Sequence, residues 1–366
     1  MAKRIKIDGR EIGEGCAPYV VAEMSGNHNR DLDRALAIIT AAKVAGADAV
    51  KLQTYRADTI TIDHHSNEFI VKGGLWNGRR LFELYEEAHT PWQWHEPIFE
   101  HARRIGISVF SSPFDQTAVD FLETLGAPAY KIASPELIDL PLIRRVACTG
   151  KPIVMSTGAA TFEEIEEAIQ TARDAGAADL IMLHCTAAYP APPEEANLKT
   201  IAALAERFNV VAGLSDHTMG TIVSTLAVGL GASFIEKHFT LARADGGVDS
   251  AFSLEPVELA ELVSNARIAY AARGKPTYGP TASEASVLRN RRSLYVVKPV
   301  GKGELLTLDN VRSIRPTNGL KPKYLDSVLG RRAVRDLMFG EPLAFDMIEG
   351  WVEPTNIRTT SSPSSS

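Results

Sequence analysis

The 366-residue sequence contains little cysteine, no long apolar run and no excess of basic residues. Its three cysteines, Cys16, Cys148 and Cys185, are too few and too scattered for a disulfide framework or a zinc cluster. No apolar run approaches the ~18 residues of a membrane span. The charged N-terminal stretch lacks the apolar segment of a secretory signal peptide. We therefore expect a reducing, cytoplasmic location and no association with membranes.

The charge balance also limits the partners. The net charge is −6, so the basic footprint of a nucleic-acid-binding protein is absent. Neither a P-loop nor a GxGxxG motif is present, so no nucleotide-binding fold is indicated by motif. An anionic ligand must instead be held by a local cluster of cations. Hydrophobic residues make up 45% of the chain, which is ordinary for a globular protein with a large core.

Short apolar runs alternate with amphipathic stretches through the first 280 or so residues, and the apolar runs predict parallel strands buried on both faces. The predicted strands are Tyr19–Glu23, Ala47–Gln53, Ser108–Ser111, Ala129–Ala133, Pro152–Ser156, Leu180–Cys185, Val210–Leu214 and Phe234–His238. Helices are predicted at Asp31–Ala45, Thr161–Ala175, Gly220–Leu230 and Glu255–Ala272. Eight such units predict an α/β fold, a (β/α)₈ TIM barrel, with a doubly wound sheet as the alternative.

The composition changes after about residue 280. We predict a barrel domain over 1–283, with a loop-side insertion at Gly73–His95, and an arginine-rich linker over 284–292. Short strands such as Ser293–Val297, separated by glycine-containing turns, predict a small β-rich domain over 293–352. The Ser/Thr/Pro-rich tail, 353–366, is predicted to be disordered.

Polar side chains follow the predicted barrel strands, at the end where barrel enzymes place their active sites. Lys51 and Lys131 lie in nearly apolar strands, where a charge is costly to bury unless it is paired or binds a ligand. With nearby serines they predict a pocket for a ligand that carries a phosphate or a phosphate and a carboxylate. His217 and His238 end adjacent strands and could together hold a divalent metal. A structural network remains the alternative for any one of these residues taken alone.

Eight segments in order along the chain resemble the sialic acid synthase family. They are AEMSGNHN (Ala22–Asn29), KLQTY (Lys51–Tyr55), SSPFD (Ser111–Asp115), KIASPE (Lys131–Glu136), STGAA (Ser156–Ala160), HCTAAYPAP (His184–Pro192), GLSDHT (Gly213–Thr218) and EKHFT (Glu236–Thr240). The stretch Arg292–Glu349 resembles the SAF, or antifreeze-like, domain that closes this family. The resemblance covers nearly the whole chain.

The resemblance implies a metal-dependent transferase that condenses phosphoenolpyruvate with an N-acetylated amino sugar. The segments Gly73–His95, Cys185–Pro192 and Gly246–Pro256 are most similar to the branch that makes pseudaminic acid. Ala187 stands where sialic acid synthases tend to carry a polar residue. The implied substrates are phosphoenolpyruvate and 2,4-diacetamido-2,4,6-trideoxy-L-altrose, with cleavage of the C–O bond of phosphoenolpyruvate. The implied metal is Mn²⁺, Mg²⁺ or Co²⁺.

Site residues carry over from the resemblance at matching positions. The implied catalytic groups are Glu23, Lys51 and Lys131, and the implied metal ligands are His217 and His238. The implied phosphoenolpyruvate-binding residues are Lys51, Ser112, Lys131, Ser134, Ser156 and Ser215. The implied sugar-binding residues are Gln53, Glu136, Tyr189, Asp249 and Arg315. Arg315 matches the SAF-domain arginine that reaches a partner's active site, which implies a domain-swapped homodimer.

Three alternatives stay open at this stage. The chain could be an N-acetylneuraminate or legionaminic acid synthase with a manno-configured sugar, because these enzymes share the phosphoenolpyruvate half of the site. It could be an inactive carbohydrate-binding or scaffold protein with the SAF domain as a binding or dimerisation module. It could also be a 3-deoxy sugar acid synthase, although these lack a SAF domain.

Overall fold

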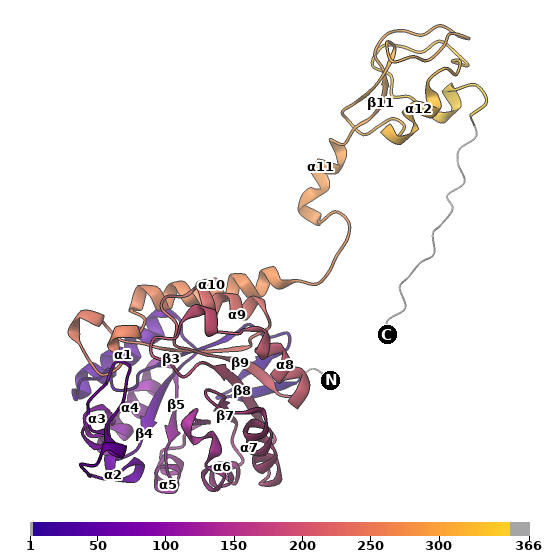
Figure 1. The fold of residues 1–366 in the computed structure, drawn as a ribbon. Helices are drawn as coiled ribbons and strands as arrows, with labels where there is room; N and C mark the ends of the chain where they lie inside the picture. Colours follow the sequence, from indigo (N-terminus) through magenta and orange to yellow (C-terminus); the bar gives the residue numbers. More distant parts are fainter. Residues whose placement is uncertain (1–2, 352–366) are drawn as a thin grey trace. The chain divides into compact units, whose positions relative to one another are not determined.

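The computed structural model describes residues 3–351 and divides the chain into two compact units, Met1–Gly274 and Lys275–Ser366 (Figure 1). The division falls at Gly274, before the predicted boundary at 283. The predicted linker, 284–292, lies in the second unit and contains helix α11 (Ala285–Arg289). The predicted disordered tail, 353–366, lies outside the described residues.

The first unit is a closed barrel of eight parallel strands in the order β10-β3-β4-β5-β6-β7-β8-β9 (Figure 1). The (β/α)₈ prediction is therefore confirmed, and the doubly wound alternative is wrong. The strands are β3 (Tyr19–Glu23), β4 (Ala49–Thr54), β5 (Ser108–Pro113), β6 (Tyr130–Ile132), β7 (Ile153–Ser156), β8 (Leu180–Cys185), β9 (Val211–Asp216) and β10 (Phe234–His238).

Helices surround the strands. They are α1 (Leu32–Ala45), α2 (Ala57–Ile60), α3 (Leu81–Ala88), α4 (Trp92–Ile105), α5 (Gln116–Thr124), α6 (Leu140–Ala147), α7 (Phe162–Asp174), α8 (Lys199–Phe208), α9 (Ile222–Gly229) and α10 (Pro256–Arg273). The Asp31 carboxylate caps α1, and Gly46 ends it in the left-handed conformation. Thr161 and Glu164 form the predicted capping box of α7. Helix α3 lies within the predicted insertion.

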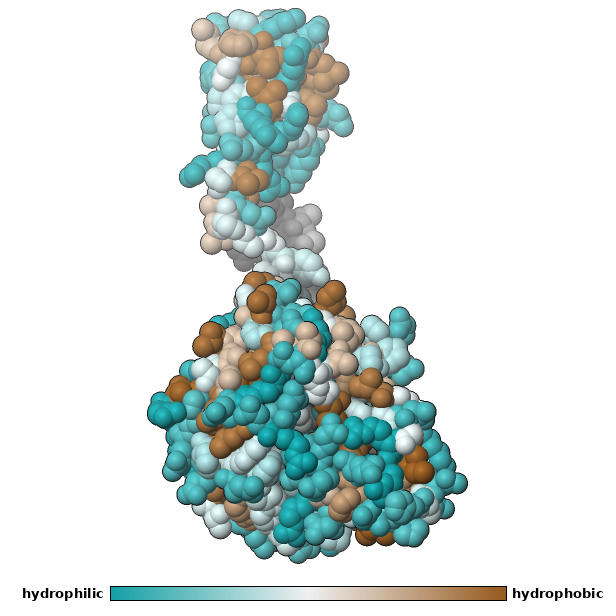
Figure 2. Space-filling model, turned by 90° about the vertical axis from the view of Figure 1, so that its left-hand side faces the viewer, coloured by the Kyte–Doolittle hydropathy of each residue, from teal (hydrophilic) through white to brown (hydrophobic). Residues whose placement is uncertain are grey.

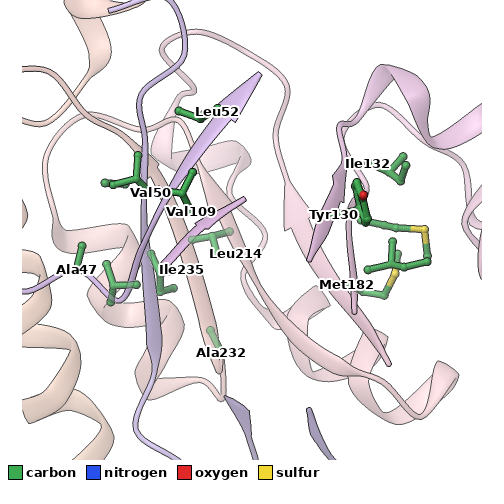
Figure 3. Packing of buried hydrophobic residues seen from close by; sticks show 14 of the residues in the cluster. Ala47, Val50, Leu52, Val109, Tyr130, Ile132, Met182, Leu214, Ala232 and Ile235 are labelled. Atoms are coloured by element: carbon green, nitrogen blue, oxygen red, sulfur yellow. The ribbon is translucent and has the colours of Figure 1, made fainter. Parts of the chain in front are cut away.

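Successive side chains of each barrel strand point alternately outward and inward. Outward residues such as Val50, Val109 and Ile235 pack in the cluster of Figure 3, which continues into the helices. Inward residues form a separate apolar cluster. We call its strand members Val21, Ala49, Phe110, Ala129, Val154, Leu183 and Phe234 the apolar inner layer. The predicted site residues lie directly beyond this layer, toward the carboxyl ends of the strands.

A β-hairpin that we did not predict contributes to the same inner cluster. Strands β1 (Arg4–Ile7) and β2 (Arg10–Gly13) pair antiparallel, and Ile5, Ile7 and Ile12 are buried in that cluster. The hairpin signal is in the sequence: Asp8-Gly9 separates two alternating segments, and both residues have positive φ, of 47° and 81°. The charged residues of this segment obscured the pattern.

The C-terminal unit has its own core. Strands β11 (Ser293–Val296) and β12 (Val311–Ile314) pair antiparallel, and α12 (Leu325–Val328) lies in the same unit. Leu294, Val296, Val311 and Leu343 are among the buried apolar residues that it shares. This unit is the small β-rich domain expected from the sequence.

Candidate active site

Every barrel strand carries a polar or thiol side chain two residues beyond a member of the apolar inner layer or, in β9, two residues beyond Gly213. We call these residues the polar inner layer: Glu23, Lys51, Ser112, Lys131, Ser156, Cys185, Ser215 and Glu236. All of them are buried. They lie toward the carboxyl ends of the strands, which is the active-site end of such barrels.

Four charged groups of this layer form one buried network. The Lys51 ammonium lies 2.7 Å from Glu23 Oε2 and 3.7 Å from Glu236 Oε1. The Lys131 ammonium donates to both Glu236 oxygens, at 3.0 and 3.1 Å. Two ammonium groups therefore share one carboxylate. Because the site is shielded from water, these charges act on a ligand far more strongly than surface charges would.

Burial and neighbouring charges shift the pKa values of the network in different directions. Burial raises the pKa of Glu23, and the Lys51 ammonium only partly opposes this. For Glu236 burial acts in the same direction, but Lys131 and Lys51 outweigh it and lower its pKa. Burial lowers the pKa of Lys131. Glu23 is thus the carboxylate better suited to accept a proton, and Glu236 remains ionised.

The predicted serines surround this network. Ser112 Oγ accepts from Lys51 at 3.2 Å, and Ser215 Oγ donates to Glu236 at 3.3 Å. Ser134 Oγ accepts from the Gly158 amide at 3.0 Å. Ser156 Oγ is buried and has no hydrogen-bond partner within residues 3–351. A buried hydroxyl without a partner is unusual and is consistent with a ligand that completes it.

His217 and His238 lie side by side, with ring centroids 5.4 Å apart. His217 Nδ1 donates to the Thr186 carbonyl at 2.9 Å, which leaves Nε2 free to bind a metal. His238 Nδ1 is buried and makes no hydrogen bond to any described residue. Burial, followed by His217 and the two site lysines, lowers the pKa of His238, so its ring is neutral.

The pair fits an open metal site rather than a closed one. Within the described part of the chain, no group of three or more His, Cys, Asp or Glu side chains could hold a metal ion. Two neutral imidazole nitrogens can bind a divalent ion whose other positions are taken by water or substrate oxygens. The orphaned His238 nitrogen and the fixed His217 tautomer agree with this arrangement.

Two of the predicted sugar-side residues, Gln53 in β4 and Asp249, are connected to Glu23 by hydrogen bonds. Gln53 Nε2 donates to Glu23 Oε1 at 3.0 Å and to Ser25 Oγ at 3.3 Å. Ser25 also donates a short hydrogen bond to Asp249, which precedes the 3₁₀ helix Ser250–Phe252. Asp249 Oδ2 lies 3.9 Å from His238 Nδ1. Gln53 and Asp249 are thereby linked to both Glu23 and the histidine pair.

Glu136 follows Ser134 in the loop after β6, within the 3₁₀ helix Pro135–Ile138. Burial raises its pKa to about 7. Glu136 Oε2 has no hydrogen-bond partner in the part of the chain that the structure describes. A neutral carboxyl at this place can donate to an acceptor on a ligand as well as accept from a donor.

An aromatic wall stands beside the histidines. Tyr189 lies 4.3 Å from His217 between ring centroids, and Phe252 lies 4.9 Å from His238. Trp76, from the predicted insertion, lies 5.6 Å from Tyr189 and donates to the Val248 carbonyl at 3.0 Å. The sequence alone assigned no role to Phe252. The position of Trp76 and Phe252 at the histidine pair makes both candidates for contact with an apolar sugar face.

Arg315 belongs to the C-terminal unit and is exposed there. With Arg291 and Arg292 it lines a cavity of about 510 Å³. The barrel residues predicted from the sequence therefore come together, while Arg315 is carried by the other unit. Among the polar inner layer, Glu236 received no assigned role from the sequence, although its charge inside an apolar strand was visible there.

These features define a (β/α)₈ barrel with a buried Lys/Glu network and an adjacent histidine pair, joined to a small β-rich unit. The NeuB family model matches residues 38–278, and the SAF domain model matches residues 291–349. The chain belongs to the NeuB family.

Two relatives match this chain along most of their length. A pseudaminic acid synthase from Campylobacter jejuni is 45% identical over 89% of this chain and 95% of its own. One from Helicobacter pylori is 43% identical over 91% of this chain and 98% of its own. The crystal structure of an N-acetylneuraminic acid synthetase from Leptospira borgpetersenii has 30% identity and a TM-score of 0.71, and covers 79% of this chain and 96% of that chain.

None of the helices in residues 3–351 is both long and apolar enough to cross a bilayer. The cytoplasmic location expected from the sequence stays a prediction.

Proposed function

We propose that this chain condenses phosphoenolpyruvate with 2,4-diacetamido-2,4,6-trideoxy-L-altrose and water, and releases pseudaminic acid and phosphate. The observation that carries the proposal is the pair of buried ammonium groups, Lys51 and Lys131, which both approach the carboxylate of Glu236, while Lys51 also pairs with Glu23. They provide a water-shielded site for one small, highly charged anion. The relatives named pseudaminic acid synthase support the choice of sugar.

Phosphoenolpyruvate binds at the polar inner layer. Lys51 and Lys131 supply the positive charge for its phosphate and carboxylate, and Ser112, Ser134, Ser156 and Ser215 supply hydroxyl groups. The unpartnered hydroxyl of Ser156 donates to one of the ligand oxygens. Glu236 keeps the two ammonium groups near each other before the substrate arrives.

In the bond-forming step, C3 of phosphoenolpyruvate attacks the aldehyde carbon of the open-chain sugar, and positive charge develops at C2. Water adds to C2, and Glu23 accepts the proton that this water loses and returns it to the aldehyde oxygen, which has become an alkoxide. Phosphate then leaves with the bridging oxygen and takes up the proton of the C2 hydroxyl, so the C–O bond breaks and C2 becomes the ketone. Lys51 and Lys131 stabilise the departing negative charge.

His217 and His238 would hold a divalent metal, Mn²⁺, Mg²⁺ or Co²⁺. When bound there, the ion supplies Lewis-acid polarisation of the aldehyde oxygen. On the protein side, Tyr189 covers the His217 ring, and Asp249 and Gln53 orient the sugar beside Glu23.

We assign the sugar preference to the part of the pocket wall that holds Ala187. A Cβ built on Gly158 would lie 2.9 Å from Ala187 Cβ and 2.7 Å from Ser134 Oγ, so Ala187 borders the serine-lined wall. A methyl group there offers no hydrogen bond to a hydroxyl of a manno-configured sugar. The alternative is a legionaminic or N-acetylneuraminic acid synthase, which would share every phosphoenolpyruvate contact.

The test offers the metal-loaded protein phosphoenolpyruvate with each of three sugars and measures phosphate release. The sugars are the altrose derivative, its manno isomer and N-acetylmannosamine. We expect turnover with the altrose derivative alone. Preference for another sugar would overturn the sugar assignment only. With ¹⁸O in the bridging position, the label must appear in phosphate; label retained in the sugar acid would overturn C–O cleavage.

We also propose a domain-swapped homodimer in which Arg315 serves the partner's barrel. Exposed apolar residues on the barrel helices, such as Val44, Ile222 and Val257, are compatible with a protein interface. Figure 2 shows hydrophobic residues scattered over a largely hydrophilic face.

Mixing the inactive variants Arg315→Ala and Lys131→Met tests this arrangement. Random assembly restores about a quarter of the active sites if Arg315 acts across the dimer. No recovery would assign Arg315 to its own barrel.

A further inference from the structure

The histidine pair is backed by a buried ion pair on the opposite face of the same two strands. Asp216 and Lys237 are register partners on β9 and β10, and each immediately precedes one of the histidines. Because side chains alternate along a strand, Ser215 and Glu236 point into the barrel and Asp216 and Lys237 point outward. Both outward side chains are 1% exposed.

Asp216 and Lys237 together hold the backbone that follows His217. Asp216 Oδ1 accepts from the Thr218 amide at 2.8 Å, and Asp216 Oδ2 accepts from the Lys237 ammonium at 2.7 Å. Lys237 also donates to the Thr218 carbonyl at 2.5 Å, and Ser224 Oγ of α9 donates to Asp216 Oδ2 at 2.5 Å. Both polar backbone groups of Thr218 are therefore fixed by this pair.

The backbone of His217 is held from the other side as well. Its carbonyl accepts from the Ala191 amide at 2.9 Å, and its Nδ1 donates to Thr186 in the same loop. The ring thus has one defined tautomer and little freedom of position. Lys237 restrains His238, the next residue in the chain. Its side chain is bound on the outer face of β10, and this limits the movement of the strand segment that carries His238.

Stability alone does not explain such a pair. A buried ion pair costs much of its Coulomb energy in desolvation, and well-packed apolar residues often replace it without loss. A metal site is different, because groups behind the ligands determine how well the ligands are oriented. This pair costs desolvation energy but restrains both strands that carry the predicted ligands. Its favourable contribution is therefore expected in metal binding.

We propose that Asp216 and Lys237 are positioning residues for His217 and His238, and that they set the affinity of this site for a divalent ion. The proposal rests on the proposed metal site. It concerns orientation only, because neither side chain points into the barrel. Ser224 supports the same pair, because its hydroxyl donates to the Asp216 oxygen that also binds Lys237.

The experiment measures Mn²⁺ binding to metal-stripped full-length protein by equilibrium dialysis, without substrate. The variant Asp216→Asn/Lys237→Met removes both charges and keeps the side-chain volumes. We expect its Kd for Mn²⁺ to rise about 10- to 100-fold. The matched control is Arg10→Met/Asp48→Asn, a pair 3.1 Å apart at the other end of the barrel that also holds backbone, through the Val20 amide. Its Kd should not change.

The outcomes separate the proposals. Wild-type protein that binds no Mn²⁺, or binds it equally after His217→Ala and His238→Ala, overturns the metal site and this inference with it. Binding in the wild type with an unchanged Kd in the folded double variant overturns this inference alone. If the double variant does not fold, Ser224→Ala replaces it, with an expected increase in Kd of about 3-fold. An unchanged Kd for Ser224→Ala then overturns the inference.

Discussion

The apolar and polar inner layers occupy the same strands of one barrel, only two residues apart. Val21, Phe110 and Phe234 give way to Glu23, Ser112 and Glu236 at the next inward position. The apolar inner layer contributes stability through burial of apolar surface. The polar inner layer buries charges and an unpartnered hydroxyl, which costs stability. This difference within one barrel locates function more directly than any single residue does.

The largest effect should follow from removing a charge of the polar inner layer. Lys131→Met takes away an ammonium group 3.0 Å from Glu236 and leaves that carboxylate with less compensation. We expect kcat/KM for phosphoenolpyruvate to fall about 10³-fold. Steady-state phosphate release measures it, and circular dichroism checks that the variant is folded. A loss below about 10-fold would contradict the role of Lys131 in binding the anion.

A substitution in the apolar inner layer should lower the stability of the protein and leave its activity nearly unchanged. Phe110 is fully buried, and Phe110→Ala should lower the free energy of unfolding by about 3 kcal/mol. Urea denaturation measures this loss. The fraction that remains folded should keep its kcat/KM within about 3-fold, because Phe110 contacts no reacting group. A large loss of activity in folded Phe110→Ala protein would mean that the two layers are not functionally separate.

Glu136 tests whether ionisation of a carboxyl group in the site lowers the stability of the folded protein. Its folded pKa is about 7, raised by burial from 4.5. The folded state therefore binds the proton more tightly, and this contribution to stability is lost as pH rises from 4.5 through 7. Glu136→Gln cannot ionise, so it should be more stable than wild type by about 2 kcal/mol at pH 8. Equal stability differences at pH 5 and pH 8 would contradict the raised pKa.

The barrel was predictable because its strands are continuous apolar runs. Tyr19–Glu23, Leu180–Cys185 and Phe234–His238 were predicted with the bounds that the structure has. Charged residues at the ends of such runs pointed to the site for a physical reason: a buried charge requires a partner or a ligand. The family resemblance added roles to these residues, and it supplied Asp249 and Arg315, which the pattern had not selected.

What the sequence could not supply is the direction of each side chain. In Phe234–His238 the charges of Glu236 and Lys237 are adjacent, and nothing local tells which one faces the barrel interior. Only the closed register places Glu236 on Lys131 and Lys237 on Asp216. For the same reason Trp76 and Phe252, which come from separate loops, could not be assigned to the histidine pair.

The smallest effects are expected from alanine substitutions of Ser156 and Ser112, two serines of the polar inner layer. Ser156 Oγ has no partner in residues 3–351, whereas Ser112 Oγ accepts from Lys51. Ser156→Ala should raise KM for phosphoenolpyruvate about 5-fold and leave the free energy of unfolding unchanged or up to about 1 kcal/mol higher. Ser112→Ala should raise KM similarly but lower stability by about 1 kcal/mol, because Lys51 loses an acceptor. If Ser156→Ala is instead the destabilising variant, its hydroxyl serves the fold and not the ligand.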